Sequence, residues 1–329
     1  MTQSLKIIFM GTPEFGAIIL EKLAQTPFKP VLVVTSPDKP EGREQALTSS
    51  PVKVVARKYN IPVSQPEKIR DIVGKLRELN PDLIVVAAFG QILPKEILDI
   101  PKRGSLNVHP SVLPKYRGPS PIQSTILDGE EKTGVTIILM DEKMDHGPII
   151  KQQVIRLKGD ETFESLSKRL AETGSTLLIN TISFWLKEMI ESNPQDERDA
   201  TYTKIFTKED GEINWRKSAK QIEREMRAFY PWPGSYTFWE RKGRWGKRGQ
   251  SIRIKIIKAK VLKSSGIPYP LGKTIAAPDK KFYIQCGGIP SGTPTDFLLV
   301  EELQLEGGKP ISSEDLLKGY PDFIGAVLK

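Results

Sequence analysis

Cysteine and histidine are scarce in this chain of 329 residues, which contains one cysteine, Cys286, and two histidines, His109 and His146. A single thiol excludes a disulfide framework, and a zinc site generally needs several cysteine or histidine ligands, so we expect no bound metal. So few histidines raise the question of whether His109 packs in a core or takes part in chemistry.

Long apolar runs are also missing. No stretch approaches the roughly 20 apolar residues that a membrane-spanning helix needs. The first apolar run is short and leads into a turn of Gly and Pro, unlike a secretory signal. With 38% hydrophobic and 27% charged residues, the composition is that of a soluble globular protein, and we expect a cytoplasmic protein without membrane contact.

Acidic residues are too few to balance the basic residues in the last part of the chain. Residues 204–329 hold 23 Lys and Arg against 14 Asp and Glu, whereas residues 1–203 hold 26 of each, so the net charge of +9 lies entirely beyond residue 203. The densest segment, residues 240–263, has ten basic residues and one acidic residue. Two interpretations stay open for it: a solvated strand pair whose lysines protect a sheet edge, or a surface that binds nucleic-acid phosphates.

The first 150 residues alternate strand and helix patterns. Helical patterns occur at 15–25 and 67–80, between apolar, β-branched runs that predict strands at 5–11, 30–36, 82–90, 105–109 and 134–140. This alternation predicts an α/β fold, a Rossmann-like domain with a largely parallel sheet that binds ligands at the carboxyl ends of its strands.

The rest of the chain predicts a second domain. Residues 161–190 form one long helical pattern or two, and the polar segment 191–203 has the composition of a linker. Domains of residues 1–190 and 204–329 follow from this division. Short strand patterns with Gly and Pro turns predict a small OB-like β-barrel for the second domain.

A polar pair marks the end of one predicted strand. In SLNVH at 105–109, a period of two places Asn107 and His109 on the same side of the backbone. Pro110 and Pro114 follow, so the strand gives way to a loop shaped by proline. An amide and an imidazole beside such a loop indicate a candidate site.

A second polar cluster, with Asp141, Asp145 and His146, follows the predicted strand 134–140. If Asp145 lies next to Asn107 and His109, the three provide an amide donor, an imidazole and a carboxylate. Acyl transfer to an amine without a covalent intermediate needs these groups. The amide and imidazole N–H stabilise the tetrahedral oxyanion, while the imidazole and carboxylate move the amine's proton.

Two further motifs are weaker signals. A serine nucleophile is the competing interpretation of the site, but Ser111 is offset by Pro110 and the chain has no G-x-S-x-G elbow. GTPEFG at 11–16 follows a predicted strand as a dinucleotide fingerprint would, yet Pro13 replaces the central glycine and lacks an N–H. A tight strand-to-helix turn is the favoured interpretation.

These motifs resemble a known family. NVHPSVLPKYRG at 107–118, followed by MDEKMDHGP at 140–148, is similar to the catalytic signature of folate-dependent formyltransferases, which take formyl from 10-formyltetrahydrofolate. Further similar stretches are GTPEFG, TSPDKPEGR, SPVKVVA, AFGQILP, GPSPIQ, INW at 213–215 and RAFYPWPGS at 227–235. The last two resemble the branch that formylates methionyl-tRNA, since the glycinamide ribonucleotide enzymes are similar only over the first domain.

The resemblance implies a one-carbon transferase that formylates initiator methionyl-tRNA for translation initiation. It assigns catalysis to Asn107, His109 and Asp145. The loop of Ser111, Val112, Leu113 and Pro114 would bind the folate co-substrate, with Val112 standing where the family usually has leucine. The pterin pocket would be lined by Phe89, Gly90, Gln91, Ile92, Leu93 and Pro94.

The resemblance also implies contacts with tRNA. The loop at 37–47 matches one that touches the acceptor end, and it carries Lys39 and Arg43, although Glu44, Gln45 and Ala46 stand where the family commonly has Gly and lysines. From the basic segment we expect Arg244, Lys247 and Arg248 to contact the tRNA backbone. We expect the protein to act as a monomer.

Two alternatives remain open. A formyltransferase acting on a sugar amine shares the three catalytic groups but needs no basic surface, so tRNA binding that weakens with salt separates the two. A nucleic-acid-binding protein with an inactive formyltransferase core is the other, and folate binding would decide against it.

Overall fold

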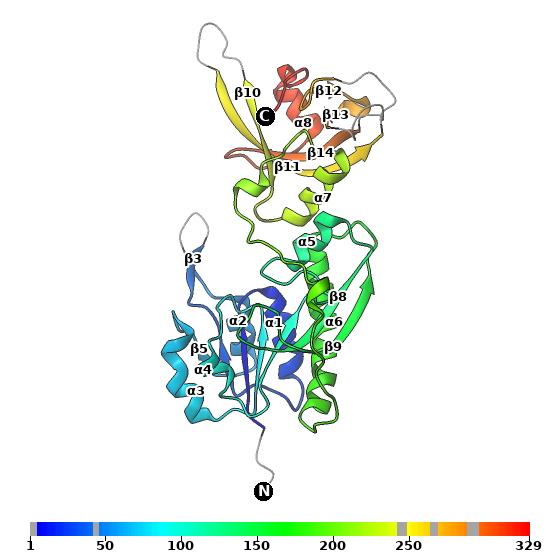
Figure 1. Cartoon of the computed structure of the whole chain (residues 1–329). Coiled ribbons are helices and arrows are strands. Elements are labelled where there is room, and N and C mark those ends of the chain that lie inside the picture. Colours follow the sequence, from blue (N-terminus) through cyan, green and yellow to red (C-terminus); the bar gives the residue numbers. More distant parts are fainter. Residues whose placement is uncertain (1–4, 42–45, 242–248, 264–268, 288–295) are drawn as a thin grey trace. The chain divides into compact units, whose positions relative to one another are not determined.

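The computed structural model describes residues 5–41, 46–241, 249–263, 269–287 and 296–329. The chain divides into two compact units (Figure 1). The first comprises Met1–Thr125, Glu131–Lys158 and Ser165–Lys204, and the second comprises Ile126–Glu130, Gly159–Glu164 and Ile205–Lys329. No helix among the described residues is both long and apolar enough to cross a membrane.

The first unit is built on a sheet in the order β5-β2-β1-β6-β7-β8-β9. Its strands are β1 (Ile7–Gly11), β2 (Leu32–Val34), β5 (Val63–Ser64), β6 (Leu83–Ala87), β7 (Ser105–His109), β8 (Lys132–Leu139) and β9 (Ile149–Arg156), and a separate hairpin joins β3 (Lys39–Glu41) to β4 (Ala46–Thr48). The strands from β5 to β7 pair in parallel, whereas β8 and β9 are antiparallel. The predicted α/β fold with a largely parallel sheet is confirmed.

Helices alternate with these strands as the sequence predicts. They are α1 (Glu14–Ala24), α2 (Pro51–Lys58), η1 (Ile69–Ile72), α3 (Val73–Leu79), α4 (Lys95–Leu98), α5 (Pro121–Asp128), α6 (Phe163–Trp185) and η2 (Glu197–Asp199). The Ser50 side chain caps α2 by accepting from Lys53 N at 3.1 Å, and Pro51 occupies the first turn, where its missing N–H costs nothing.

Alternating residues of the strands pack on opposite faces of the sheet. Ile8 and Ile84 share a buried apolar cluster with Leu76 of α3. Toward β7, α6 packs so closely that a Cβ on Gly174 would lie 2.9 Å from a methyl group of Val108. Because neighbours on a strand alternate, Asn107 and His109 project from the face opposite Val108.

The motif GTPEFG forms a tight strand-to-helix turn, as favoured from the sequence. Strand β1 ends at Gly11 and α1 begins at Glu14. A Cβ on either Gly11 or Gly16 would lie 2.7 Å from the Ala87 carbonyl oxygen. The two glycines therefore allow close packing of the turn on β6.

The polar segment 191–203, expected to be a linker, is held within the first unit along most of its length. Asn193 forms an antiparallel bridge with Ile149, and Tyr202 forms a parallel bridge with Arg117. Several side chains of this segment contact the candidate site described below.

The second unit is an antiparallel sheet in the order β10-β11-β14-β13-β12, with β15 paired to β14. Its elements are η3 (Glu209–Gly211), α7 (Ala219–Phe229), β10 (Ser235–Arg241), β11 (Gln250–Leu262), β12 (Thr274–Ala276), η4 (Pro278–Lys280), β13 (Phe282–Gln285), β14 (Phe297–Leu305), β15 (Pro310–Ser312), α8 (Ser313–Gly319) and η5 (Pro321–Phe323). The core includes Trp239, Ile254, Phe282 and Leu298.

The end of the chain joins the two edges of this sheet. Leu328 bridges Trp239 of β10, and Val327 bridges Lys273, which precedes β12. Backbone hydrogen bonds run in both directions between Phe238 and Lys329. The predicted β-barrel domain is confirmed: its antiparallel sheet forms a half-barrel, and the last residues bridge both of its edges.

Candidate active site

The Asp145 carboxylate lies next to the polar side chains at the end of β7. Asn107 Nδ2 donates to Asp145 Oδ1 at 3.1 Å, and Gly118 N donates to Asp145 Oδ2 at 2.8 Å. His109 Nδ1 lies 3.5 Å from the same Oδ1, and the side chains of His109 and Asp145 are only 4% and 13% exposed. Loop residue Asp145 thus meets both polar side chains of the neighbouring strand.

His109 is in contact through both ring nitrogens. Its Nε2 lies 2.9 Å from the Tyr116 carbonyl oxygen, which can only accept, so Nε2 carries a hydrogen. Nδ1 faces Asp145. The ring can therefore exchange a proton with Asp145 through Nδ1 while Nε2 remains anchored.

The backbone around the site adopts uncommon conformations. Tyr116 and Asp145 have φ of 62° and 50°, a region that bulky side chains rarely occupy and that Asp tolerates better. Gly118 has φ of 107°, and a Cβ there would lie 2.9 Å from Thr203 Oγ1, so the position requires glycine. Backbone strain of this kind often occurs at functional sites.

The predicted folate loop is tied to the neighbouring strands. Thr136 Oγ1 donates to Ser111 O at 2.7 Å and accepts from Leu113 N at 3.1 Å, while Gln152 Nε2 donates to Leu113 O at 2.7 Å. Ser111 and Leu113 are buried, and Val112 is half-buried. Ser111 Oγ donates to Lys115 O at 2.6 Å, so the hydroxyl is committed to the loop.

The second predicted folate segment follows the carboxyl end of β6, next to β7. Phe89 and Leu93 are 2% and 3% exposed in the apolar core. The Gln91 amide accepts from Ile69 N and donates to Glu67 O. Ile92 is 75% exposed, and Gly90 has φ of 85°.

The second histidine belongs to a different set of contacts. His146 Nδ1 lies 2.5 Å from Asp141 Oδ2, and Nε2 lies 3.6 Å from Glu197 Oε1. Within the described ranges, no group of three His, Cys, Asp or Glu side chains is arranged to hold a metal ion.

Most of the predicted tRNA contacts lie outside the described residues, namely Arg43, Arg244, Lys247 and Arg248. Lys39 is exposed at the start of β3. Directly before it, the Asp38 carboxylate accepts from Lys53 Nζ at 2.5 Å and from Gln65 Nε2 at 2.8 Å. The Lys53 ammonium holds the pKa of Asp38 below its usual range, and these bonds fix the base of the hairpin.

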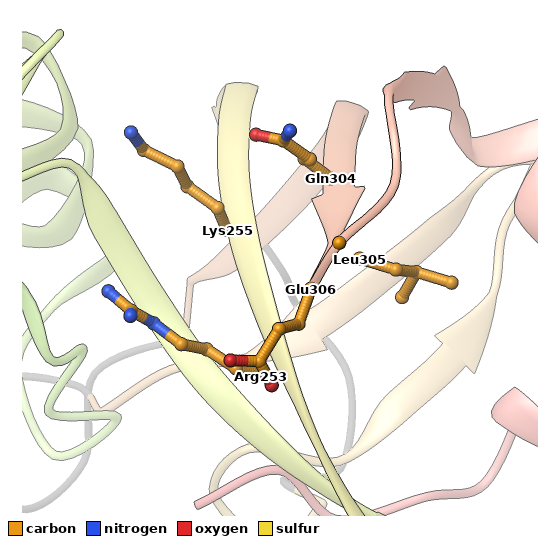
Figure 2. A pocket seen from close by; sticks show the side chains of 6 residues that line it. Arg253, Lys255, Gln304, Leu305 and Glu306 are labelled. Carbon is orange, nitrogen blue, oxygen red and sulfur yellow. The ribbon is translucent and has the colours of Figure 1, made fainter. Parts of the chain in front are cut away.

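The basic strand β11 pairs with β10 and β14 on its two sides, so it is not a sheet edge. Arg253 and Lys255 extend from it toward the same side and line a pocket with Gln304 and Glu306 (Figure 2). The Arg253 guanidinium lies 3.9 Å from the centre of the Tyr236 ring. Burial, with a smaller effect of Arg253, lowers the pKa of Lys255.

Sequence reasoning missed the groups that hold the site together. They include the Gly118 amide, the Tyr116 carbonyl, Thr136 and Gln152. The glycine directly after the proline-shaped loop was a usable signal for Gly118. Thr136 and Gln152 lie on strands far along the chain and gave no signal.

The fold and this set of amide, imidazole and carboxylate define the class of the protein. The formyl transferase family matches residues 5–182, and the formyl transferase C-terminal domain family matches residues 205–321. Proteins named methionyl-tRNA formyltransferase from Halalkalibacterium halodurans and Chloroflexus aurantiacus are each 42% identical to the chain, over 96% of it and 95% and 97% of their own lengths. The chain belongs to the methionyl-tRNA formyltransferase family.

Solved structures share the fold. An N-formyltransferase from Helicobacter canadensis, in complex with folinic acid and dTDP-3-aminofucose, has a TM-score of 0.62 at 22% identity, covering 90% of this chain and 98% of that one. HypX from Aquifex aeolicus, in complex with tetrahydrofolic acid, has a TM-score of 0.60 at 15% identity, covering 98% and 48%.

Proposed function

We propose that this chain transfers the formyl group of 10-formyltetrahydrofolate to the amino group of initiator methionyl-tRNA. The observation that carries the proposal is that Asn107 and His109 both face Asp145. It occurs in a chain that is 42% identical, over 96% of its length, to a protein named methionyl-tRNA formyltransferase. The product is N-formylmethionyl-tRNA, and tetrahydrofolate is released.

The three groups divide the chemistry. The amine nitrogen attacks the formyl carbon, and the oxyanion of the tetrahedral intermediate accepts a hydrogen bond from Asn107. The two ring nitrogens of His109 already face Tyr116 O and Asp145, so we assign His109 to proton transfer and not to the oxyanion. An amide NH₂ has two hydrogens, and Asn107 uses one on Asp145, which leaves the other for the oxyanion. The proton that the amine loses is taken up by the Asp145–His109 pair, and one proton is returned to N10 of the folate as its bond to the formyl carbon breaks, so no net proton is consumed.

The formyl donor is assigned to the two loops that follow β6 and β7. Adjacent parallel strands bring these loops to the same edge of the sheet. Because Phe89, Leu93, Ser111 and Leu113 are buried, we assign their contribution to backbone groups and to the shape of the loops. Ile92 is exposed, and its side chain is available to a ligand.

We assign tRNA binding to the segment 37–47, which includes Lys39 and Arg43, and to the basic surface around β11 in the second unit. A tRNA is a polyanion bound largely through its phosphates, which suits the excess of nine positive charges beyond residue 203. Arg253 and Lys255, which share one side of β11, extend the predicted set of Arg244, Lys247 and Arg248. We take the protein to act as a monomer in the cytoplasm.

A sugar amine is the alternative acceptor, because one structural neighbour was solved with dTDP-3-aminofucose. The test offers initiator methionyl-tRNA, elongator methionyl-tRNA and dTDP-3-aminofucose with 10-formyltetrahydrofolate as donor. We expect formylation of the initiator tRNA, with binding that weakens steeply as salt rises. Preferential formylation of the sugar at any salt concentration would overturn the proposal.

A further inference from the structure

The segment 193–203, named here the strap, is bonded to the loop after β7. Arg117 N donates to Thr201 O, and Thr203 N donates to Arg117 O, each at 2.8 Å. The Thr201 hydroxyl accepts from Tyr116 N at 2.8 Å. The strap therefore restrains Tyr116, whose carbonyl contacts His109, and Arg117, which directly precedes the Gly118 amide that contacts Asp145.

The side chain of Arg117 is the main attachment of the strap. Arg117 is fully buried, and three strap residues accept from its guanidinium. Nε and Nη2 donate to Gln195 Oε1 at 3.1 and 2.9 Å, and Nη1 donates to the Tyr202 hydroxyl at 3.0 Å. The Glu197 carboxylate accepts from both Nη atoms, at 3.0 and 2.7 Å. A buried guanidinium needs such partners, because an unpaired buried charge is strongly destabilising.

Gln195 extends this attachment to the catalytic carboxylate. Its Oε1 accepts from Arg117, and its Nε2 donates to the carbonyls of Asp145 and Gly147, at 2.8 Å each. Asp145 has φ of 50°, so its backbone needs restraint to hold the carboxylate toward Asn107. The bonds of Gln195 supply that restraint.

We infer that Gln195, oriented by the Arg117 guanidinium, is a positioning residue that holds the Asp145 carboxylate against Asn107 and His109. The inference rests on the proposed function. Reacting groups must be held to well under 1 Å, and losing the partner that orients a functional group typically costs about 10- to 100-fold.

The test uses the full chain and Gln195→Glu, which is nearly isosteric. The new carboxylate still accepts from Arg117 but cannot donate to the carbonyls of Asp145 and Gly147. Gln195→Met removes the donor without adding charge and serves as a second variant. It also removes the Oε1 acceptor, so among the described residues Arg117 keeps only Glu197 and Tyr202 as side-chain partners in that variant. Arg198→Gln is the matched control, because Arg198 lies in the strap, is 89% exposed and pairs with Asp196.

Single-turnover formylation, KM for donor and tRNA, and thermal unfolding are measured for each variant. We expect both Gln195 variants to lose about 10- to 100-fold in rate. The KM values should stay within about two-fold for both variants. The unfolding midpoint of Gln195→Glu, which keeps the acceptor for Arg117, should stay within about 3 °C, and Arg198→Gln should equal the unmodified chain. In an Asp145→Asn background, Gln195→Glu should cost less than about two-fold, because residues acting as a unit are not additive.

Three results would overturn the inference while the unmodified chain is active. The first is an unchanged rate in both Gln195 variants. The second is a loss of rate by Gln195→Glu that is just as large in the Asp145→Asn background. The third is a loss of rate by Gln195→Glu that accompanies a drop in its unfolding midpoint, which would mark a purely structural role. An unmodified chain that formylates none of the offered amines would instead overturn the proposed function, and this inference with it.

Discussion

At the scale of single residues, the site depends on the largely buried carboxylate of Asp145, which three groups contact. Asp145 accepts from the side chain of Asn107 and the backbone of Gly118, and it faces the His109 ring. Electrostatic interactions are stronger in such a partly dehydrated position than in water. Replacing one group should therefore disturb the others.

Asn107→Ala should lower the rate of formyl transfer by about 100-fold or more, the usual effect of losing one oxyanion donor. Donor affinity should change little, because the amide contacts Asp145 rather than the folate loops. Single-turnover rates and equilibrium folate binding check both parts. Activity within a few-fold of the unmodified chain, in folded protein, would remove Asn107 from the mechanism.

His109 and Asp145 should act as a unit, because Nδ1 faces Oδ1. His109→Ala and Asp145→Asn should each lower the rate of formyl transfer nearly as much as the double variant does. The double variant should be scarcely slower than the slower single variant. The measurement is a double-mutant cycle, which compares the rates of the unmodified chain, the two single variants and the double variant. Losses that multiply in full would show that the two groups have separate roles.

At the scale of elements, the basic strand β11 has a neighbouring strand on each side. Its lysines and arginines therefore do not protect a sheet edge, and their charge needs a different explanation. Lys258 and Lys260 flank Glu301, at 3.5 and 2.6 Å, and the Lys260 ammonium holds the pKa of that carboxyl below its usual range. By contrast, Arg253 and Lys255 form no ion pair within the described part of the chain.

Arg253→Gln with Lys255→Gln should weaken tRNA binding and flatten the dependence of log affinity on log salt by roughly 0.7 to 0.9 for each phosphate that the protein no longer neutralises. Lys258→Gln with Lys260→Gln removes the same charge and is the control. If position rather than net charge matters, the control should have much the smaller effect. Equal slopes in both double variants would mean that only the overall charge of the unit attracts the tRNA.

The elements of the sheet differ in how well sequence predicted them. SLNVH forms β7 at the expected residues, because its alternation and flanking prolines are local signals. The two-residue β5 is too short to produce a pattern. Strand β9 was missed because exposed polar residues interrupt its apolar residues. The antiparallel direction of β8 depends on its pairing with β7 and on no local residue.

The strap shows where local patterns fail. Its composition is typical of a linker, yet Arg117 and Gln195, 78 positions apart, bond through their side chains. Only the folded chain brings them together. That Asn107 and His109 meet Asp145 could be predicted, because the first two end β7 and Asp145 follows the neighbouring β8, whereas the contacts of Arg117 and Gln195 could not.

At the scale of the whole molecule, the proposed catalytic groups lie in the first unit, and the whole excess of positive charge lies beyond residue 203. The second unit also contains the only cysteine of the chain, Cys286, which is fully buried in the barrel core. This thiol therefore reports on the unfolding of the barrel.

Burial raises the pKa of Cys286 from 9.0 to about 12. Because the folded state holds this proton more tightly, the thiol's contribution to stability is complete below pH 9. It falls by up to about 1.4 kcal/mol per pH unit above that. An aromatic disulfide reagent at pH 8 should label the native protein at least 100-fold more slowly than the urea-unfolded protein. Labelling at the unfolded rate would place the thiol outside the core.

The most direct test of the proposed site is a single-turnover assay of formyl transfer from 10-formyltetrahydrofolate to initiator methionyl-tRNA. Binding of the donor is followed in the same samples. We expect the unmodified chain to formylate the tRNA. Asp145→Asn should bind the donor within about two-fold but transfer formyl at least roughly 100-fold more slowly. Equal transfer rates for the two proteins, or no transfer by the unmodified chain, would contradict the assignment of this site and its chemistry.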